Sequence, residues 1–175
     1  MSVDSRKEVP ALVLGQGLTA LGTLRSLAEA GIPAWVACPQ GDLATHSRWF
    51  RRAPGPFWNG SVSPAATALL EGLPFERAVP IPCADDVALW LSGIADGPLA
   101  GRFPTSIPPR ATLEILQDKD RFAAYLAGTR IPHPRTFPLS NESDLHQVPF
   151  GEIDRLFLKP ADSQAFARAK ARKGI

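Results

Sequence analysis

The fold is decided by the stretch Ala11–Ala20, ALVLGQGLTA, which joins a short apolar run to a glycine-rich turn. Its first four residues are apolar throughout, as in a central strand of a parallel sheet that is buried on both faces. A helix with one apolar face is predicted next, and that face comprises Leu21, Leu24, Leu27 and Ala28. Gly31 and Pro33 end this helix, and a second strand is predicted at residues 34–38. The pattern is a β-α-β unit, which predicts a right-handed crossover and a parallel sheet.

Two further segments extend this pattern. A helix is predicted from the Ser63-Pro64 start, with Ser63 as its N-cap, to the stop at Gly72. A third strand at residues 77–82 is followed by a helix, for which Asp85 is the expected N-cap and Asp86 a first-turn charge. The proline-rich segment 101–109 then interrupts regular structure. Residues 1–109 are therefore predicted to form an α/β domain, a Rossmann-like parallel sheet flanked by helices.

Composition excludes several classes of protein. The 175 residues are 45% hydrophobic and 21% charged, which is typical of a globular chain. The net charge is only +2, and four basic residues stand close together between Arg168 and Lys173, which is no argument for nucleic-acid binding. Cys38 and Cys83 lack metal-ligand spacing and are predicted to be small buried hydrophobes. Without a signal-like apolar segment or a membrane-length run, we expect a cytoplasmic protein.

A second pattern lies between residues 113 and 160. Asp118 is predicted to cap a helix that Lys119 opens and Gly128 ends, with Phe122, Tyr125 and Leu126 as its apolar stripe. The segment Ile131–Pro134 then forces extended backbone. Residues 155–159 are predicted to be a buried strand with Lys159 at its exit, where ligands of α/β folds usually gather.

The order of these pieces resembles the ATP-grasp superfamily, nearest its carboxylate–amine ligase branch. The resemblance rests on Asp118-Lys119, on the segment 128–136 (GTRIPHPRT) and on Leu158–Pro160. It implies that residues 110–175 are the first elements of an ATP-grasp domain and that Lys119 and Lys159 bind nucleotide phosphates, a role suited to a point-charge ammonium. Without the resemblance, Lys119 is a solvated first-turn lysine and Lys159 a strand-end lysine paired with a carboxylate.

In that family a Rossmann-like domain precedes the ATP-grasp domain and carries a glycine loop beside the acceptor substrate. The resemblance therefore makes Gly15, Gly17 and Thr19 substrate-side residues. Arg48, in a family-like His-Ser-Arg-Trp element at residues 46–49, would clamp a carboxylate or phosphate. For the glycines the alternative is a tight turn with close helix–sheet packing. For Arg48 it is a surface turn, with the neighbouring aromatic side chains packed against the sheet.

The same glycine turn also matches a dinucleotide fingerprint, Gly-x-Gly-x-x-Ala. NAD(P) binding also requires an acid at the end of the second strand, about twenty residues on. The first acid after that strand is Asp42, four residues past it. NAD(P) binding therefore stays a third hypothesis.

The segment 161–166 corresponds by resemblance to the loop that closes over the triphosphate, with Ser163 and Lys173 as further phosphate ligands. It has no glycine, although backbone approach to phosphates favours one. The family's adenine hinge and Mg²⁺ carboxylates would lie beyond Ile175, so we expect no ligase activity from these 175 residues by themselves.

The sequence thus predicts the N-terminal part of an ATP-dependent ligase that joins a small carboxylate to an amine through an acylphosphate, with ATP and Mg²⁺. We expect neither nucleic acid nor a membrane as a partner. We expect instead either a homodimer or a partner chain that completes the ATP-grasp domain. The main alternative is a non-catalytic Rossmann-like binding or partner module.

Overall fold

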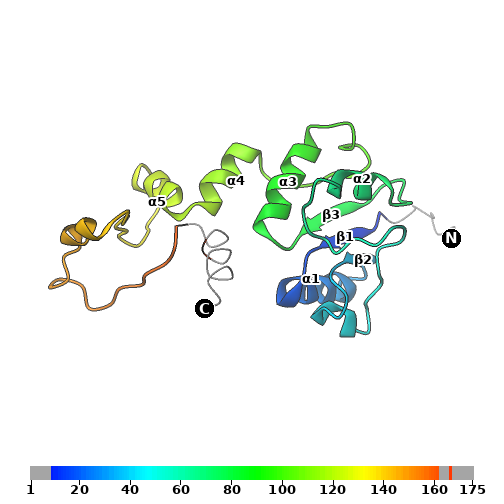
Figure 1. Ribbon diagram of the computed structural model, residues 1–175, viewed down its shortest axis with the longest axis horizontal. Coiled ribbons are helices and arrows are strands. Elements are labelled where there is room, and N and C mark those ends of the chain that lie inside the picture. Colours follow the sequence, from blue (N-terminus) through cyan, green and yellow to red (C-terminus); the bar gives the residue numbers. More distant parts are fainter. Residues whose placement is uncertain (1–8, 162–165, 167–175) are drawn as a thin grey trace, which may run out of the picture. The chain divides into compact units, whose positions relative to one another are not determined.

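A computed structural model of the protein describes residues 9–161 and 166. It comprises two compact units, Met1–Arg110 (unit 1) and Ala111–Ile175 (unit 2), which Figure 1 shows in the colours of the sequence. This division falls one residue after the boundary predicted from the proline-rich segment 101–109.

Unit 1 contains an open sheet of three parallel strands. These are β1 (Ala11–Leu14), β2 (Ala34–Ala37) and β3 (Val79–Pro82), in the order β2-β1-β3. Central β1 is buried at all four positions, as its uninterrupted apolar sequence predicts for a strand covered on both faces. On the outer edge of β2, Val36 forms an isolated parallel bridge with Arg52. The sheet confirms the predicted α/β class and the parallel arrangement.

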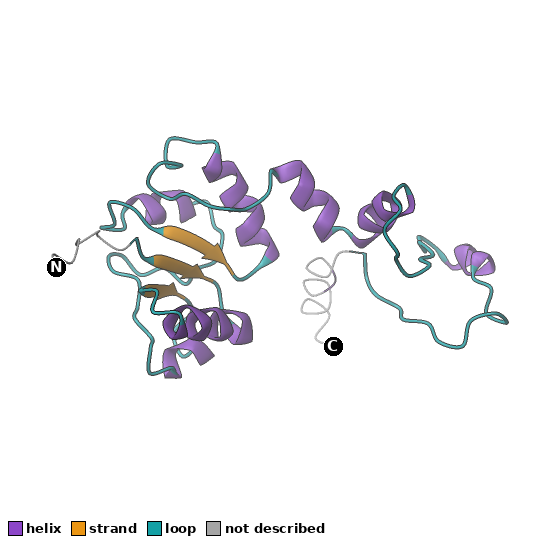
Figure 2. Cartoon of the chain, turned by 180° about the vertical axis from the view of Figure 1, so that it is seen from behind, coloured by secondary structure: helices purple, strands orange, loops and turns teal. Residues whose placement is uncertain are grey.

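Helices cover both faces of this sheet (Figures 1 and 2). Helix α1 (Gly17–Glu29) packs on the face that receives Ala11 and Val13, together with the 3₁₀ turn η1 (Leu43–His46). Helices α2 (Ala66–Glu71) and α3 (Asp85–Ala95) pack on the face of Leu12 and Leu14. Because side chains alternate along a strand, the four residues of β1 supply both cores of unit 1.

Two helix starts differ from the prediction, by two residues for α2 and by one residue for α3. Helix α2 begins at Ala66, because Ser63 instead begins a turn in which its carbonyl accepts the N–H of Ala66. Helix α3 has Ala84 rather than Asp85 at the N-cap, so Asp85 lies within the first helical turn. Both aspartates still contribute favourable charge to the helix N-terminus. The apolar face of α3 is buried at Val87, Leu91 and Ile94.

In unit 2, helix α4 (Arg110–Gln117) begins at the last residue of unit 1, and α5 (Lys119–Ala127) and the 3₁₀ turn η2 (Glu142–Gln147) follow. The Asp118 side chain accepts the N–H groups of Asp120 and Arg121, and Gly128 follows the last residue of α5. The predicted cap and stop of this helix are therefore confirmed.

The prediction of a strand at residues 155–159 is wrong. This segment is a loop, and Phe157 and Leu158 are 86% and 89% exposed. A strand needs a neighbour to hydrogen-bond its backbone. Among the described residues of unit 2, no other segment forms a strand that could be this neighbour.

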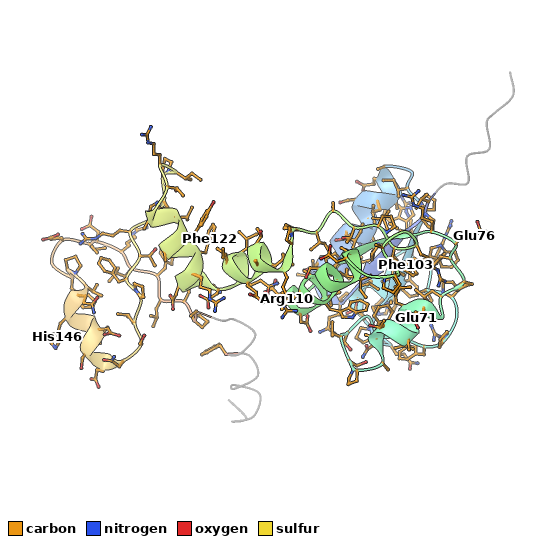
Figure 3. All side chains as sticks on the ribbon, turned by 90° about the horizontal axis from the view of Figure 1, so that it is seen from above. Glu71, Glu76, Phe103, Arg110, Phe122 and His146 are labelled. Atoms are coloured by element: carbon orange, nitrogen blue, oxygen red, sulfur yellow. The ribbon has the colours of Figure 1, made fainter. Side chains whose placement is uncertain are left out.

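Unit 2 buries little apolar surface. Within its described part, Leu113 and Val148 are the buried hydrophobic residues. The apolar stripe of α5 is present but not covered, since Phe122 and Tyr125 are 36% and 56% exposed. Figure 3 shows Phe122 and His146 on separate short segments of this unit, whereas Phe103 lies among the crowded side chains of unit 1. In the part of the chain that is described, no helix combines the length and apolarity needed to cross a bilayer.

Candidate functional site

The carboxyl ends of the three strands form one edge of the sheet in unit 1. Gly15 follows β1, Cys38 follows β2 and Cys83 follows β3. Open parallel sheets bind ligands at this edge, because the loops and helix N-termini that leave the strands converge there. The glycine turn predicted to face a substrate lies at this position, at the start of α1.

Gly15 is buried in internal packing. Its N–H donates to the carbonyl of Ala37 (3.1 Å), and its φ of +136° is a conformation that residues with a side chain rarely adopt. A Cβ on Gly15 would lie 2.8 Å from the Cβ of Cys83. In the loop between β2 and α2, a Cβ on Gly60 would collide with the carbonyl of Ala37 and approach the nitrogen of Gly15 to 2.6 Å. Gly15 therefore supports the alternative of close packing, with a loop seated over its backbone.

Gly17 is arranged differently. Its φ is +69°, and a Cβ built on it would meet nothing within 4 Å. Its N–H donates to Asp42 Oδ2 at 2.7 Å, and Asp42 Oδ1 accepts the N–H of Ala44 at 2.9 Å. A carboxylate of the chain itself thus lies at the positive end of the α1 dipole, where an external anion would be favoured. Thr19, in the first turn of α1, is exposed.

Arg48 lies in a tight turn between η1 and the edge of β2. Phe50 N–H donates to the Ser47 carbonyl (2.9 Å), and the Ser47 hydroxyl accepts the N–H of Trp49 (3.4 Å). This is a serine-initiated turn, in which Arg48 and Trp49 occupy the two central positions. The Arg48 guanidinium carbon is 4.2 Å from the centre of the Trp49 ring. Trp49 and Phe50 pack against the core on the α1 face, which confirms the predicted packing of the turn.

The structure does not bring Arg48 together with the glycine turn. Arg48 lines an open groove with Arg25 and Glu29, in the second half of α1. Arg25 is eight residues after Gly17 in the helix, about 12 Å along the axis. Gly17 and Thr19 are therefore neighbours, whereas Arg48 belongs to a different part of the surface of unit 1.

Both cysteines lie at the carboxyl edge. Burial raises the pKa of the Cys38 thiol, and the nearby carboxylate of Asp42 raises it further. Burial also raises the pKa of the Cys83 thiol, and a contact with the Thr23 hydroxyl (3.8 Å) acts in the opposite direction. Thiols with raised pKa values are poor nucleophiles at neutral pH. Cys38 is buried in the core, as predicted, whereas Cys83 is only partly buried and packs against the core.

The two predicted phosphate lysines belong to unit 2. The backbone N–H of Lys119 donates to the carbonyl of Ala161 at 3.2 Å, and its ammonium Nζ lies 3.5 Å from the same oxygen. Ala161 is two residues after Lys159, whose side chain is exposed. Segments that are 42 residues apart thus meet at the first residue of α5. Ser163 and Lys173 lie outside the described residues.

Two residues of the carboxyl edge were not identified from the sequence. In the sequence, Asp42 stands out only as the first acid after the second predicted strand, although an acid before a short helical turn is also a capping signal. Gly60 had no local signal, because its importance arises from contact with β1 and β2. Within residues 9–161 and 166, no group of three or more histidine, cysteine or acidic side chains has the arrangement of a metal site.

Comparisons of the chain with protein-family models, with curated proteins and with solved structures found no match.

Proposed function

We propose that the chain is the N-terminal part of an ATP-dependent carboxylate–amine ligase of the ATP-grasp type. In this proposal unit 1 contributes the substrate side, through the open surface at Gly17 and Thr19. Unit 2 contributes cations for the nucleotide phosphates, through Lys119 and Lys159.

The observation that carries the proposal is the pair of contacts from Lys119 to the Ala161 carbonyl. They hold the start of α5 against the segment that contains Lys159. The start of α5 and the segment that contains Lys159 therefore lie side by side, as binding of a single polyphosphate by both lysines would require. The Asp118 cap fixes the backbone at the same helix start, where partial positive charge also favours an anion.

In this proposal, the residues of the chain position the substrates and neutralise the negative charge of the phosphates. In the proposed reaction, the γ-phosphoryl group of ATP passes to a substrate carboxylate, and an amine then displaces phosphate from the acylphosphate to give an amide. Ammonium groups beside the phosphates offset the charge on the oxygens during phosphoryl transfer. Lys119 and Lys159 would supply this charge.

The described residues do not fit a magnesium site. Mg²⁺ prefers carboxylate and water oxygens in octahedral geometry. No suitable group of acidic side chains occurs among residues 9–161 and 166.

Isothermal titration of the protein with ATP tests the proposal. We expect saturable binding that weakens about tenfold in Lys119→Ala and in Lys159→Ala, since each variant loses one charge-assisted contact. Arg130→Ala is the matched control, because Arg130 is an exposed cation of the same unit and should leave affinity unchanged. Equal losses in all three variants, or no saturable binding, would refute the assignment of the lysines.

A second candidate function is favoured by the exposed apolar side chains of unit 2. Phe157 is 86% exposed and Phe166 is 56% exposed, and large exposed apolar surfaces commonly mark sites of protein association. A partner module would need no nucleotide. Sedimentation of the purified protein together with its co-purifying chains tests this: a fixed stoichiometric complex that forms equally well with Lys119→Ala would favour the partner module over the ligase.

A further inference from the structure

Two adjoining grooves lie on the α1 side of unit 1, on the part of its surface remote from the glycine turn. The first, about 430 Å³, is bounded by α1 and by the turn that follows η1, and its lining includes Arg25, Glu29 and His46. The second, about 360 Å³, continues toward the start of β2 and its lining includes Ile32 and Arg51. Arg48 and Trp49 line both, so the grooves are two parts of one surface depression.

The turn that carries Arg48 and Trp49 is anchored at both ends. On one side, the Asp42 carboxylate and carbonyl hold η1 through Ala44 and Thr45. On the other side, Val36 N–H donates to the Arg51 carbonyl (2.8 Å), and Ala53 N–H donates to the Val36 carbonyl (2.9 Å). A side chain on a short turn with fixed ends loses less conformational entropy on binding than one on a free loop. The shape of the groove is therefore set by the fold.

The charge of the depression is positive. Three arginines, Arg25, Arg48 and Arg51, contribute to its lining, and Glu29 is the carboxylate among the lining residues. The Arg48 guanidinium is held over the Trp49 ring, which restricts its rotamers while leaving its edge available to an anion. Apolar side chains complete the second groove, which is also lined by Leu24, Ala28, Ile32, Pro33 and Phe50.

We propose that this depression is a binding site for a small organic carboxylate with an apolar body, distinct from the substrate surface at Gly17. The carboxylate group lies at Arg48, the arginine that lines both grooves, and the apolar body lies in the second groove against Trp49, Ile32 and Phe50. Guanidinium groups recognise carboxylates through paired N–H donors, and the apolar wall adds affinity in proportion to the area that it covers. The site is independent of the proposed ligase function, because it uses neither lysine and no residue of unit 2.

Benzoate is a suitable probe, and the indole N–H signals of the four tryptophans provide the readout in an NMR titration of the full chain. Trp49→Phe identifies the Trp49 signal by its loss. We expect benzoate to shift the Trp49 signal in a saturable manner and to leave Trp58 and Trp90 unaffected, because they pack against each other on the opposite face of the sheet. Acetate, which lacks the apolar body, and benzyl alcohol, which lacks the charge, should each bind about tenfold more weakly.

Arginine variants complete the test. Arg48→Ala should weaken benzoate binding about tenfold, as loss of a charge-assisted contact predicts. Arg52→Ala is the matched control: Arg52 is an exposed arginine of the same loop, but its guanidinium lies 4.8 Å from the ring of Phe57, and it lines neither groove. Equal weakening in both variants would show non-specific attraction and overturn the site. So would a Trp49 signal that does not move, or inorganic phosphate that binds as tightly as benzoate.

Discussion

At the scale of single residues, the carboxyl edge of the sheet is organised by side chains that satisfy the chain's own backbone. Asp42 accepts the N–H groups of Gly17 and Ala44, and its charge raises the pKa of Cys38. Arg102 has a comparable role near the end of α2. Its guanidinium donates to the carbonyls of Phe75 (2.7 Å), Glu71 (2.8 Å) and Leu73. One long cation thus satisfies one carbonyl at the end of the short helix α2 and two carbonyls just after it, and α2 has no basic residue of its own in its last turn.

Replacing Arg102 should therefore destabilise unit 1. Arg102→Ala removes all three hydrogen bonds that the charged guanidinium donates to carbonyls. We expect the free energy of unfolding to fall by about 3 kcal/mol. Arg102→Lys keeps the positive charge but lacks the forked donors of a guanidinium, so it should restore only part of the lost stability. Urea unfolding measures both. Arg77→Ala, at an exposed arginine of the same unit, is the control and should lie within about 0.5 kcal/mol of the wild type.

The pKa of Cys38 should respond to Asp42. Asp42→Asn removes the negative charge that raises the pKa, so alkylation of Cys38 by iodoacetamide should reach its half-maximal rate at a lower pH. The pKa of Cys83 should be the same in Asp42→Asn as in the wild type. Thr23→Val should raise the pKa of Cys83 alone, because the contact with the Thr23 hydroxyl lowers that pKa. An unaltered profile for Cys38 in Asp42→Asn would disprove the coupling.

The same raised pKa values determine a pH dependence of stability. The folded state holds both thiol protons more tightly than the unfolded chain does. This contribution is fully present below the unfolded thiol pKa of about 8.5 and is lost as the pH rises through the folded value. Stability should accordingly decline in that alkaline range, and the decline should be smaller in a Cys38→Ser, Cys83→Ser protein.

At the scale of elements, the loop that carries Trp58 and Gly60 lies over the ends of β1 and β2. Trp58 is buried in the core, and its indole N–H donates to the carbonyl of Ser61 (2.9 Å). Gly60 has a φ of +76° and approaches the Gly15 to Ala37 hydrogen bond too closely to carry a side chain. The close packing at the glycine turn thus depends on a second, distant glycine.

Two Gly→Ala variants should have opposite effects. Gly60→Ala combines a disfavoured φ with a steric overlap at the Ala37 carbonyl, and we expect a destabilisation of about 3 kcal/mol. Gly22→Ala, within α1, has an open position for its Cβ and should stabilise the protein by about 0.7 kcal/mol. Thermal unfolding separates the two, and a Gly60→Ala protein as stable as the wild type would contradict the packing described for this loop.

At the scale of the whole molecule, the two units differ in how much apolar surface they bury. Unit 1 has continuous cores on both faces of its sheet. The described part of unit 2 buries Leu113 and Val148 and leaves Tyr125, Ile131 and Phe150 more than half exposed. Local stability depends on buried apolar contacts, so it should differ between the units as well.

Native-state hydrogen exchange should show this difference directly. We expect the amides of β1 and β2 to exchange only through global unfolding, and the amides of α5 to exchange through local opening at a lower free energy. A partner protein that binds over the exposed apolar side chains of α5 would slow the exchange of the α5 amides, and more so as more of the protein is bound. Equal protection of β1 and α5 in the purified protein would contradict the difference in burial.

The sequence by itself determined the local pieces of this protein. Apolar runs, glycine stops and the Asp118 cap act over a few residues, so β1, β2, α1 and α5 could be located without knowledge of the tertiary structure. Tertiary structure decided how those pieces are used, because that depends on contacts between distant segments. It buried Gly15 under Gly60, placed Asp42 at the start of α1 and separated Arg48 from the glycine turn. For the same reason Arg155–Lys159, apolar enough for a strand, forms none, since a strand exists only where another segment accepts its hydrogen bonds.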